Sequence, residues 1–148
     1  MGLELEKVIE DMSVRMRLIR AAQEDKASSE YLSERELMIL DILSRRGDMT
    51  VSEIAACEPD ASESTISTTI TRLWREKKLV SKTISPENQR TTIVGLTEKG
   101  KKTVELYNKQ RVERFKALFE AIAVTEDEEA VMIRVISRAV DYFDKHLG

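Results

Sequence analysis

Residues 62–80 read SESTISTTITRLWREKKLV. Apolar residues recur in this stretch at three- and four-residue steps, which is the spacing of a helix that buries one of its sides. The residues of that side are Ile66, Ile70 and Leu73. Ser62 precedes them and is a favoured N-cap residue, because its hydroxyl can accept a hydrogen bond from an N–H of the first turn. The stretch therefore predicts a helix with one buried side.

The opposite side of this predicted helix is polar, although the chain as a whole is acidic. Its residues are Ser64, Thr68, Thr71, Arg72 and Arg75, with Thr65 at the margin. Serine and threonine can contact bases or phosphates, and arginine can bind guanine or a phosphate through two hydrogen bonds. The serine and threonine side chains are small enough for the helix to sit deep in a DNA major groove. An ordinary solvated helix surface is the alternative interpretation.

A β-hairpin is predicted directly after the helix. Residues 79 and 80 lead into a first strand, and the β-branched residues 91–96 read as the returning strand. Residues 85–89, SPENQ, have the composition of a turn. Arg90 then lies at the hairpin tip, from which an extended guanidinium can enter a DNA minor groove. A generic exposed turn is the alternative.

Charge is distributed unevenly along the chain. The formal net charge is −3, but residues 62–102 carry nine basic and four acidic residues and thus a net charge of +5. The remainder carries 15 basic and 23 acidic residues, a net charge of −8. Binding to phosphates needs a local positive surface rather than a basic chain, so this distribution is compatible with nucleic-acid binding.

The rest of the chain predicts a predominantly helical protein. Capping boxes, in which a Ser or Thr and a Glu three residues later cap a helix start, occur at 33–36, 50–53 and 125–128. The first should open a helix that ends at Gly47 and buries Leu37, Leu40, Leu43 and either Ile39 or Ile42. Further helices are expected at 3–25, at 97–121 (with Gly100 weakening its first turn) and after 125. A polar link is expected at 25–30.

Three predicted helices carry long apolar stripes. The stripes run through residues 5–19, 104–122 and 132–143, and include Leu5, Val8, Ile9, Met12, Met16, Ile19, Val104, Tyr107, Phe115, Leu118, Phe119, Ile122, Met132, Val135, Ile136, Ala139, Val140 and Phe143. One small hairpin-and-helix core cannot cover all three. An uncovered apolar stripe is an association surface, so we expect two copies of the chain to pair.

The sequence contains few of the residues that catalysis, cofactor binding or metal binding usually requires. The chain has one cysteine, Cys57, and one histidine, His146. It shows no glycine-rich phosphate loop, no metal-ligand cluster and no nucleophile–base–acid set, so no enzyme, no catalytic residue, no cofactor and no metal site are expected. No apolar run reaches the length of a membrane span, and no signal peptide is recognisable. These observations predict a cytoplasmic protein; Cys57 reads as a structural thiol, with a redox role as the alternative.

Several short motifs in order resemble a MarR-type winged-helix transcription regulator. They are Leu32-Ser33-Glu34-Arg35-Glu36, Thr50-Val51-Ser52-Glu53-Ile54-Ala55, Ser64-Thr65-Ile66-Ser67 with Ile70 and Leu73, Lys78-Leu79-Val80, Asn88-Gln89-Arg90 and Leu96-Thr97-Glu98-Lys99-Gly100. Residues 65–78 also resemble the penicillinase-repressor branch of winged helices, but residues 96–100 favour the MarR type.

The resemblance implies a fold and an activity. The fold would be mainly α with a small β-hairpin wing: a winged helix-turn-helix lobe at 30–100, and a helical dimerisation lobe at 1–29 and 101–148. The implied activity is that of a homodimeric repressor that binds a pseudo-palindromic site in double-stranded DNA, and proteins of this type often carry a small-ligand or oxidant switch. A winged-helix adaptor that contacts proteins, without sequence-specific DNA binding, is the alternative.

The residues expected to act follow from the helix, the hairpin and the resemblance. Those expected to contact DNA are Ser62, Ser64, Thr65, Ser67, Thr68, Thr71, Arg72, Arg75, Lys82, Asn88, Gln89 and Arg90. Those that would line an effector pocket are Met12, Arg15, Met16, Tyr31 and Tyr107.

Two departures from the family pattern affect the DNA-binding part. Asn88 occupies the place where the family's wing usually has Asp, so a hydrogen bond rather than a salt bridge would orient Arg90. The turn at 58–61, Glu58-Pro59-Asp60-Ala61, is also expected to be one residue longer than the family's usual turn.

Overall fold

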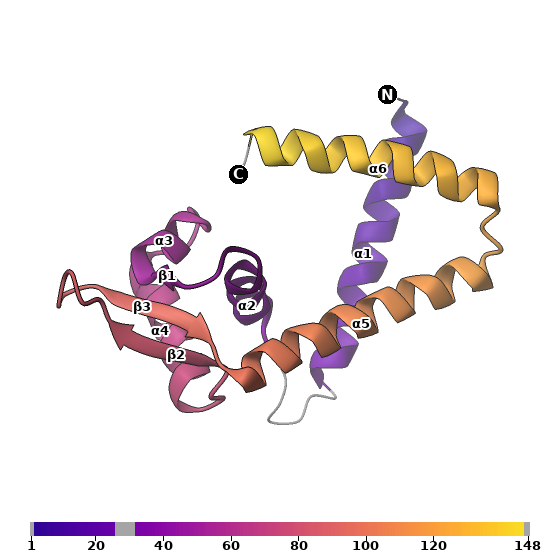
Figure 1. Ribbon diagram of the computed structural model, residues 1–148. Coiled ribbons are helices and arrows are strands. Elements are labelled where there is room, and N and C mark those ends of the chain that lie inside the picture. The colour runs from indigo at the N-terminus through magenta and orange to yellow at the C-terminus, as the bar shows by residue number, and fades with distance from the viewer. Residues whose placement is uncertain (1, 26–31, 147–148) are drawn as a thin grey trace. The chain divides into compact units, whose positions relative to one another are not determined.

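The computed structural model describes residues 2–25 and 32–146. Its elements, in chain order, are α1 (Leu3–Asp25), α2 (Glu34–Arg46), β1 (Met49–Thr50), α3 (Val51–Ala56), α4 (Glu63–Arg75), β2 (Val80–Ile84), β3 (Thr92–Leu96), α5 (Glu98–Ala121) and α6 (Glu126–His146) (Figure 1). The chain divides into two compact units, Met1–Val104 and Glu105–Gly148, whose boundary falls within α5. The predicted mainly helical fold with a small hairpin is confirmed. Of the predicted link at 25–30, Asp25 ends α1 and residues 26–30 lie outside the described residues.

A three-stranded antiparallel sheet forms in the first unit, in the order β1-β3-β2. Strands β2 and β3 make the predicted hairpin, with Val80 opposite Leu96 and Ile84 opposite Thr92. Strand β1 pairs with the other edge of β3, where Met49 lies opposite Val94. The sequence did not predict β1, because a two-residue strand has no periodicity of its own.

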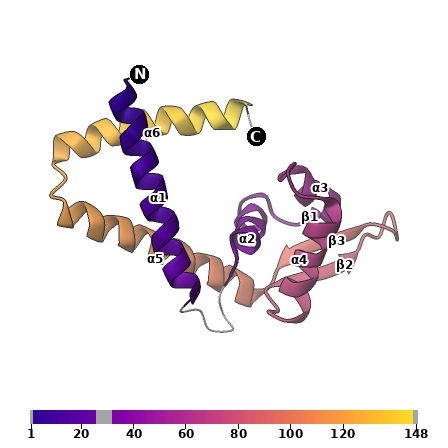
Figure 2. The same cartoon turned by 180° about the vertical axis from the view of Figure 1, so that it is seen from behind.

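Helices α2, α3 and α4 pack around one apolar core together with the sheet. Its fully buried side chains are Ile39, Leu40, Ile54, Ile66, Ile70, Leu73, Val80 and Val94. The expected burial of Leu40 and Leu43 is confirmed, and of the two isoleucines it is Ile39 that is fully buried. Leu37 is only half-buried, contrary to expectation. Figure 2 shows α4 beside the sheet, with the β2–β3 hairpin projecting beyond it.

The three predicted capping boxes do not all form as expected. The box at Ser33 and Glu36 forms in both directions, and so does the box at Thr125 and Glu128. At the start of α3 the Thr50 hydroxyl accepts from the Glu53 N–H, as predicted. However, the Glu53 carboxylate accepts from the Thr50 hydroxyl instead of from its backbone N–H. The α3 box is therefore only half formed.

Two glycines have specific structural roles. Gly47 ends α2 with a positive φ of 79°, and its N–H donates to the Leu43 carbonyl. Gly100 lies where α5 passes close to the chain before β2: a Cβ there would come 2.1 Å from the Leu79 carbonyl oxygen. The sequence suggested only that Gly100 weakens the first turn of α5. The structure shows instead that this turn needs a residue without a side chain.

The apolar stripes of α1, the later part of α5 and α6 are largely exposed in the single chain. Leu5, Val8, Ile9, Met12, Met16, Ile19, Phe115, Leu118, Ile122, Val135, Ile136, Val140 and Phe143 are each between 45% and 62% exposed. Val104, at the other end of α5, is buried. Within the described ranges, no helix is long and apolar enough to cross a membrane.

Candidate DNA-binding surface

Helix α4 presents one buried and one open side. The Ser62 hydroxyl caps the helix by accepting from the Thr65 N–H at 3.1 Å. Ile66, Ile70 and Leu73 have no exposed surface. The predicted open side is exposed at Ser64, Thr65, Thr68, Arg72 and Arg75. Glu63, the acidic residue nearest to this side, accepts a hydrogen bond from Ser52 of α3. The open side therefore combines hydroxyl and guanidinium groups.

Three threonine hydroxyls of α4, those of Thr68, Thr69 and Thr71, donate their protons to carbonyls of the helix itself. Thr68 Oγ1 donates to the Ser64 carbonyl at 2.9 Å, and Thr69 and Thr71 do the same one turn back. Such bonds leave the oxygen lone pairs available as acceptors. In this arrangement the exposed Thr68 offers lone pairs and a methyl group to a partner. Thr69, in contrast, is buried.

Thr71 and Ser67 lie at the side of the open face rather than on it. Both are half-buried, and Lys82 Nζ of β2 donates to Thr71 Oγ1 at 3.2 Å. The same ammonium group lies 5.0 Å from the centre of the Trp74 ring, which also has the Arg75 guanidinium 5.2 Å away. Thr71 is therefore less exposed than Thr68, although the sequence placed both on the polar side of the helix, and its expected contact with DNA stays a prediction. Thr71 helps to place Lys82 at the flank of α4.

The hairpin tip is held by four hydrogen bonds, one of which runs from the Glu87 N–H to the Ser85 hydroxyl at 3.3 Å. Ser85 N–H donates to the Thr91 carbonyl and Thr91 N–H to the Asn88 carbonyl, each at 2.9 Å. The Asn88 side-chain oxygen accepts from the backbone N–H of Arg90 at 3.0 Å. Asn88 thus shapes the turn, whereas the sequence had suggested that it orients the Arg90 side chain. Asn88, Gln89 and Arg90 are all exposed.

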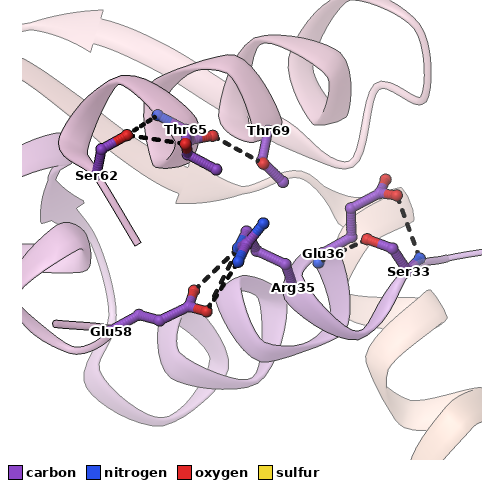
Figure 3. Close-up of polar contacts among 7 residues, drawn as sticks. All are labelled: Ser33, Arg35, Glu36, Glu58, Ser62, Thr65 and Thr69. Atoms are coloured by element: carbon purple, nitrogen blue, oxygen red, sulfur yellow. Dashed lines mark hydrogen bonds and ion pairs between the residues drawn. The ribbon is translucent and has the colours of Figure 1, made fainter. Parts of the chain in front are cut away.

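A polar hollow of about 400 Å³ lies on the other flank of α4, beside α2. We call it the Arg35 hollow; it is lined by Ser33, Arg35, Ser64, Thr65, Thr68, Thr69 and Arg72. Arg35 makes a two-pronged ion pair with Glu58 of the turn before α4, with Nε and Nη2 at 3.2 Å from the carboxylate oxygens. Figure 3 shows the Arg35 guanidinium between Glu58 and the hydroxyl-bearing side of α4.

Arg35 is not among the binding residues predicted from the sequence. Residues 33–36 predicted a helix start and formed part of a family motif, but neither pattern indicated a role for the Arg35 side chain. The signal that could have identified Arg35 was its position on α2 two residues after a cap, together with the acidic Glu58 in the turn before α4. The turn before α4 closes on a hydrogen bond from the Ala61 N–H to the Glu58 carbonyl at 3.1 Å.

Comparison with known sequences places the chain in a family. A sequence profile of the MarR family matches residues 32–92. The uncharacterized HTH-type transcriptional regulator YpoP of Bacillus subtilis (strain 168) is 33% identical over 108 residues, which are 72% of this chain and 73% of YpoP. The chain belongs to the MarR family. This MarR family protein is thus a transcriptional regulator and not an enzyme, as the sequence predicted.

Solved structures agree with this MarR family fold. Streptococcus pneumoniae FabT, in a crystal structure with DNA, matches with a TM-score of 0.73 and 18% identity over 96% of both chains. The Streptomyces coelicolor regulator PcaV, in complex with its natural ligand, matches with a TM-score of 0.57 and 22% identity over 95% of this chain and 97% of PcaV. At these identities the likeness establishes the winged-helix fold.

The described residues expected to line an effector pocket lie on separate elements of this MarR family chain. Met12 and Met16 are exposed on α1, and Arg15 bonds the Asp11 carbonyl and carboxylate on the same helix. Tyr107 is half-buried in the second unit, and Tyr31 lies outside the described residues. An effector pocket built from these residues therefore stays a prediction.

The described residues show neither a cluster that could bind a metal ion nor a contact that points to a reactive Cys57 thiol. No group of three or more His, Cys, Asp or Glu side chains in those ranges could hold a metal ion. Cys57 is half-buried; its thiol donates to the Glu53 carbonyl and accepts from Arg46, each at 3.4 Å. These contacts give the thiol a local structural role at the end of α3.

Proposed function

We propose that the protein is a homodimeric, sequence-specific DNA-binding repressor that acts in the cytoplasm on a pseudo-palindromic operator. The observation that carries the proposal is the geometry of α4. Its apolar side is fully buried while its other side presents Ser64, Thr68 and Arg75 to solvent. A helix of this width fits a major groove of about 12 Å. FabT, which shares the fold, is seen on DNA.

The flanks of α4 supply groups for the DNA backbone. Lys82 lies at one flank, where its ammonium group also contacts Thr71 and the Trp74 ring. Arg72 lies at the other and lines the Arg35 hollow. Phosphate contacts of this kind fix the register of a protein on DNA, while contacts to base edges select the sequence. In this proposal Ser64, Thr68 and Arg75 face the bases, with Ser62, Thr65 and Ser67 beside them.

The wing extends the contact to a neighbouring minor groove. Asn88, Gln89 and Arg90 are exposed at its tip. The Asn88 oxygen fixes the backbone of Arg90 at 3.0 Å, so the turn holds the start of the arginine side chain in place. A narrow minor groove attracts such a guanidinium through its enhanced negative potential.

Dimerisation is supported by the apolar stripes on α1, the later part of α5 and α6. Side chains such as Ile9, Phe115 and Ile136 are about half exposed in the single chain. Exposed apolar surface repeated over three helices is typical of an association interface. We propose that residues 1–29 and 101–148 form the dimerisation lobe and residues 30–100 the DNA-binding lobe. A two-fold dimer then presents two α4 helices about 34 Å apart, one helical turn of DNA.

Selection from a random DNA pool tests this proposal directly. The purified protein is mixed with random duplexes, and the retained molecules are sequenced. An inverted repeat with half-site centres about 10 bp apart supports the proposal. A folded protein that enriches no sequence would contradict it and favour the adaptor function. Sedimentation of the free protein tests the dimer separately, because a monomer at micromolar concentration would contradict the half-site geometry.

We also propose that a small molecule regulates the protein, as the ligand-bound structure of the similarly folded PcaV suggests. The effector would act by changing the separation of the two α4 helices. It must bind one separation more tightly than the other, because a ligand with equal affinity for both shifts nothing. Met12, Arg15, Met16, Tyr31 and Tyr107 are the candidate contacts.

A further inference from the structure

Arg35 has donors that its ion pair with Glu58 does not use. A guanidinium carries five N–H donors in a planar fork. Glu58 accepts from Nε and from Nη2, which occupies one edge of the fork. The remaining edge carries Nη1 and the second N–H of Nη2. Within the described ranges no acceptor is bonded to these donors, and Arg35 lines the hollow beside α4.

The Arg35 hollow has the composition of a phosphate site. Arg35 and Arg72 contribute two positive charges, and Ser33, Ser64 and Thr65 contribute hydroxyls. Glu58 holds the Arg35 guanidinium from the far edge, with its side chain only 23% exposed against 40% for Arg35. A planar guanidinium held in this way can give two parallel hydrogen bonds to a phosphate.

The position of the hollow beside α4 determines which DNA strand would supply the phosphate. A helix in the major groove has a DNA backbone strand on each flank. Thr65 and Arg72 line the hollow on one flank, whereas Thr71 contacts Lys82 on the other flank. With α4 in a major groove, the strand on the α2 side of α4 would run over the hollow.

We propose that Arg35, held by Glu58 and aided by Arg72, binds a DNA backbone phosphate on the α2 side of α4. The inference rests on the proposed DNA-binding function and adds a phosphate-binding group from outside α4 and the wing. In this arrangement Glu58 is a positioning residue, and Arg35 binds the phosphate. The interaction carries no sequence information, because every nucleotide presents the same phosphate.

The test compares variants on two duplexes of equal length: the duplex that the wild-type protein selects and a scrambled one. Arg35→Gln should weaken binding to both duplexes by a similar factor. The slope of log Kd against log salt should fall by about 0.9 for each phosphate that the variant no longer binds. Arg35→Lys keeps the charge and should keep most of the slope. Arg45→Gln removes an exposed charge from the other end of α2 and should leave affinity and slope unchanged.

Glu58→Gln separates phosphate binding from a structural role of the ion pair. If the pair only stabilised the fold, Glu58→Gln and Arg35→Gln would weaken DNA binding alike. In our proposal Glu58→Gln keeps a hydrogen-bond acceptor and removes a negative charge, so DNA affinity should be unchanged or higher. An Arg35→Gln protein with the wild-type salt slope would overturn the inference alone. Failure of the wild-type protein to bind either duplex would overturn the proposed function as well.

Discussion

The Glu36 carboxylate lies 2.6 Å from Lys77 Nζ and so joins the first turn of α2 to the residues that follow α4. Glu36 is 3% exposed and its other oxygen caps α2 by accepting from the Ser33 N–H. Lys77→Met removes the charge that compensates this buried carboxylate. We expect it to lower the free energy of unfolding by about 3 kcal/mol, because an unpaired buried charge is costly. Urea unfolding followed by circular dichroism measures this loss.

Lys101→Met is the matched control for Lys77→Met. Lys101 pairs with Glu98 at 3.4 Å, but both side chains are more than half exposed. Exposed pairs contribute less than about 1 kcal/mol, so the control should unfold almost like the wild-type protein. Equal losses in the two variants would show that the Glu36–Lys77 pair is no more important than a surface pair.

Gly100→Ala should destabilise the protein, although alanine is normally the better helix residue. The new Cβ would lie 2.1 Å from the backbone oxygen of Leu79, which cannot rotate away. We expect a loss of about 3 kcal/mol from the resulting displacement of α5 or β2. Gly95→Ala is the control, because its Cβ would meet only the carboxylate of Asp48, at the end of a movable side chain. A thermal unfolding midpoint for Gly100→Ala equal to that of Gly95→Ala would contradict the prediction.

Features of the fold that depend on nearby residues in the sequence were predictable, whereas features that depend on distant residues were not. Helix α4 was predictable because Ser62 caps it and Ile66, Ile70 and Leu73 repeat at helical spacing. The hairpin was predictable from its turn residues. Strand β1 was not, because Met49 and Thr50 become a strand only through pairing with β3. The exact role of Gly100 likewise depends on Leu79, which is distant from it in sequence.

The candidate site was predictable only where its residues lie on one element. The open side of α4 follows from helical geometry, so Ser64, Thr68 and Arg75 were identified correctly as exposed. The lower exposure of Thr71 was not predictable because it depends on Lys82 of another element. Arg35 was missed for the same reason: its partner Glu58 is 23 residues away in sequence, and the hollow forms only when α2 and α4 pack.

The capping box of α6 should make its stability depend on pH. The pKa of the Glu128 carboxyl lies below its usual value of 4.5, mainly because the Thr125 backbone N–H donates to it and secondarily through the Thr125 hydroxyl. A carboxyl with a lowered folded-state pKa stabilises the fold fully above the unfolded-state pKa. This contribution is lost as the pH falls through the folded-state value. Glu128→Gln should therefore lower the thermal midpoint at pH 7.

The difference between wild-type and Glu128→Gln midpoints should shrink as the pH falls through the lowered folded-state pKa of Glu128, below which both proteins carry a neutral side chain at this position. Glu129→Gln is the control, since it removes an equal charge from the same first turn of α6. Its effect at pH 7 should be smaller, because Glu128 also caps the helix. A Glu128→Gln difference that is independent of pH would contradict the assignment.

Arg90→Ala should weaken DNA binding with little dependence on the sequence of the half-site. Arg90 is exposed at the wing tip, so its replacement leaves the fold intact but removes the guanidinium from the minor groove. We expect Kd to rise about tenfold, equivalent to ~1.4 kcal/mol, with a smaller salt slope. Asn88→Ala should have an intermediate effect, because it removes the hydrogen bond to the Arg90 N–H. Fluorescence anisotropy titrations at several salt concentrations test both variants, and an unchanged Kd for Arg90→Ala would remove the wing from the interface.

Thr68→Val should change which base is preferred rather than the overall affinity. The Thr68 hydroxyl donates to the Ser64 carbonyl, so it offers a base only lone pairs and a methyl group. Valine keeps the shape but loses the acceptor, at a cost of about 1–3 kcal/mol against the base that donated to it. Repeating the selection from a random pool should show the changed position.

Thr71→Val is isosteric in the same way, but Thr71 contacts Lys82, so its selected sequence should match that of the wild-type protein. A uniform loss of affinity in Thr68→Val, with the same selected sequence, would instead make Thr68 a phosphate-binding residue.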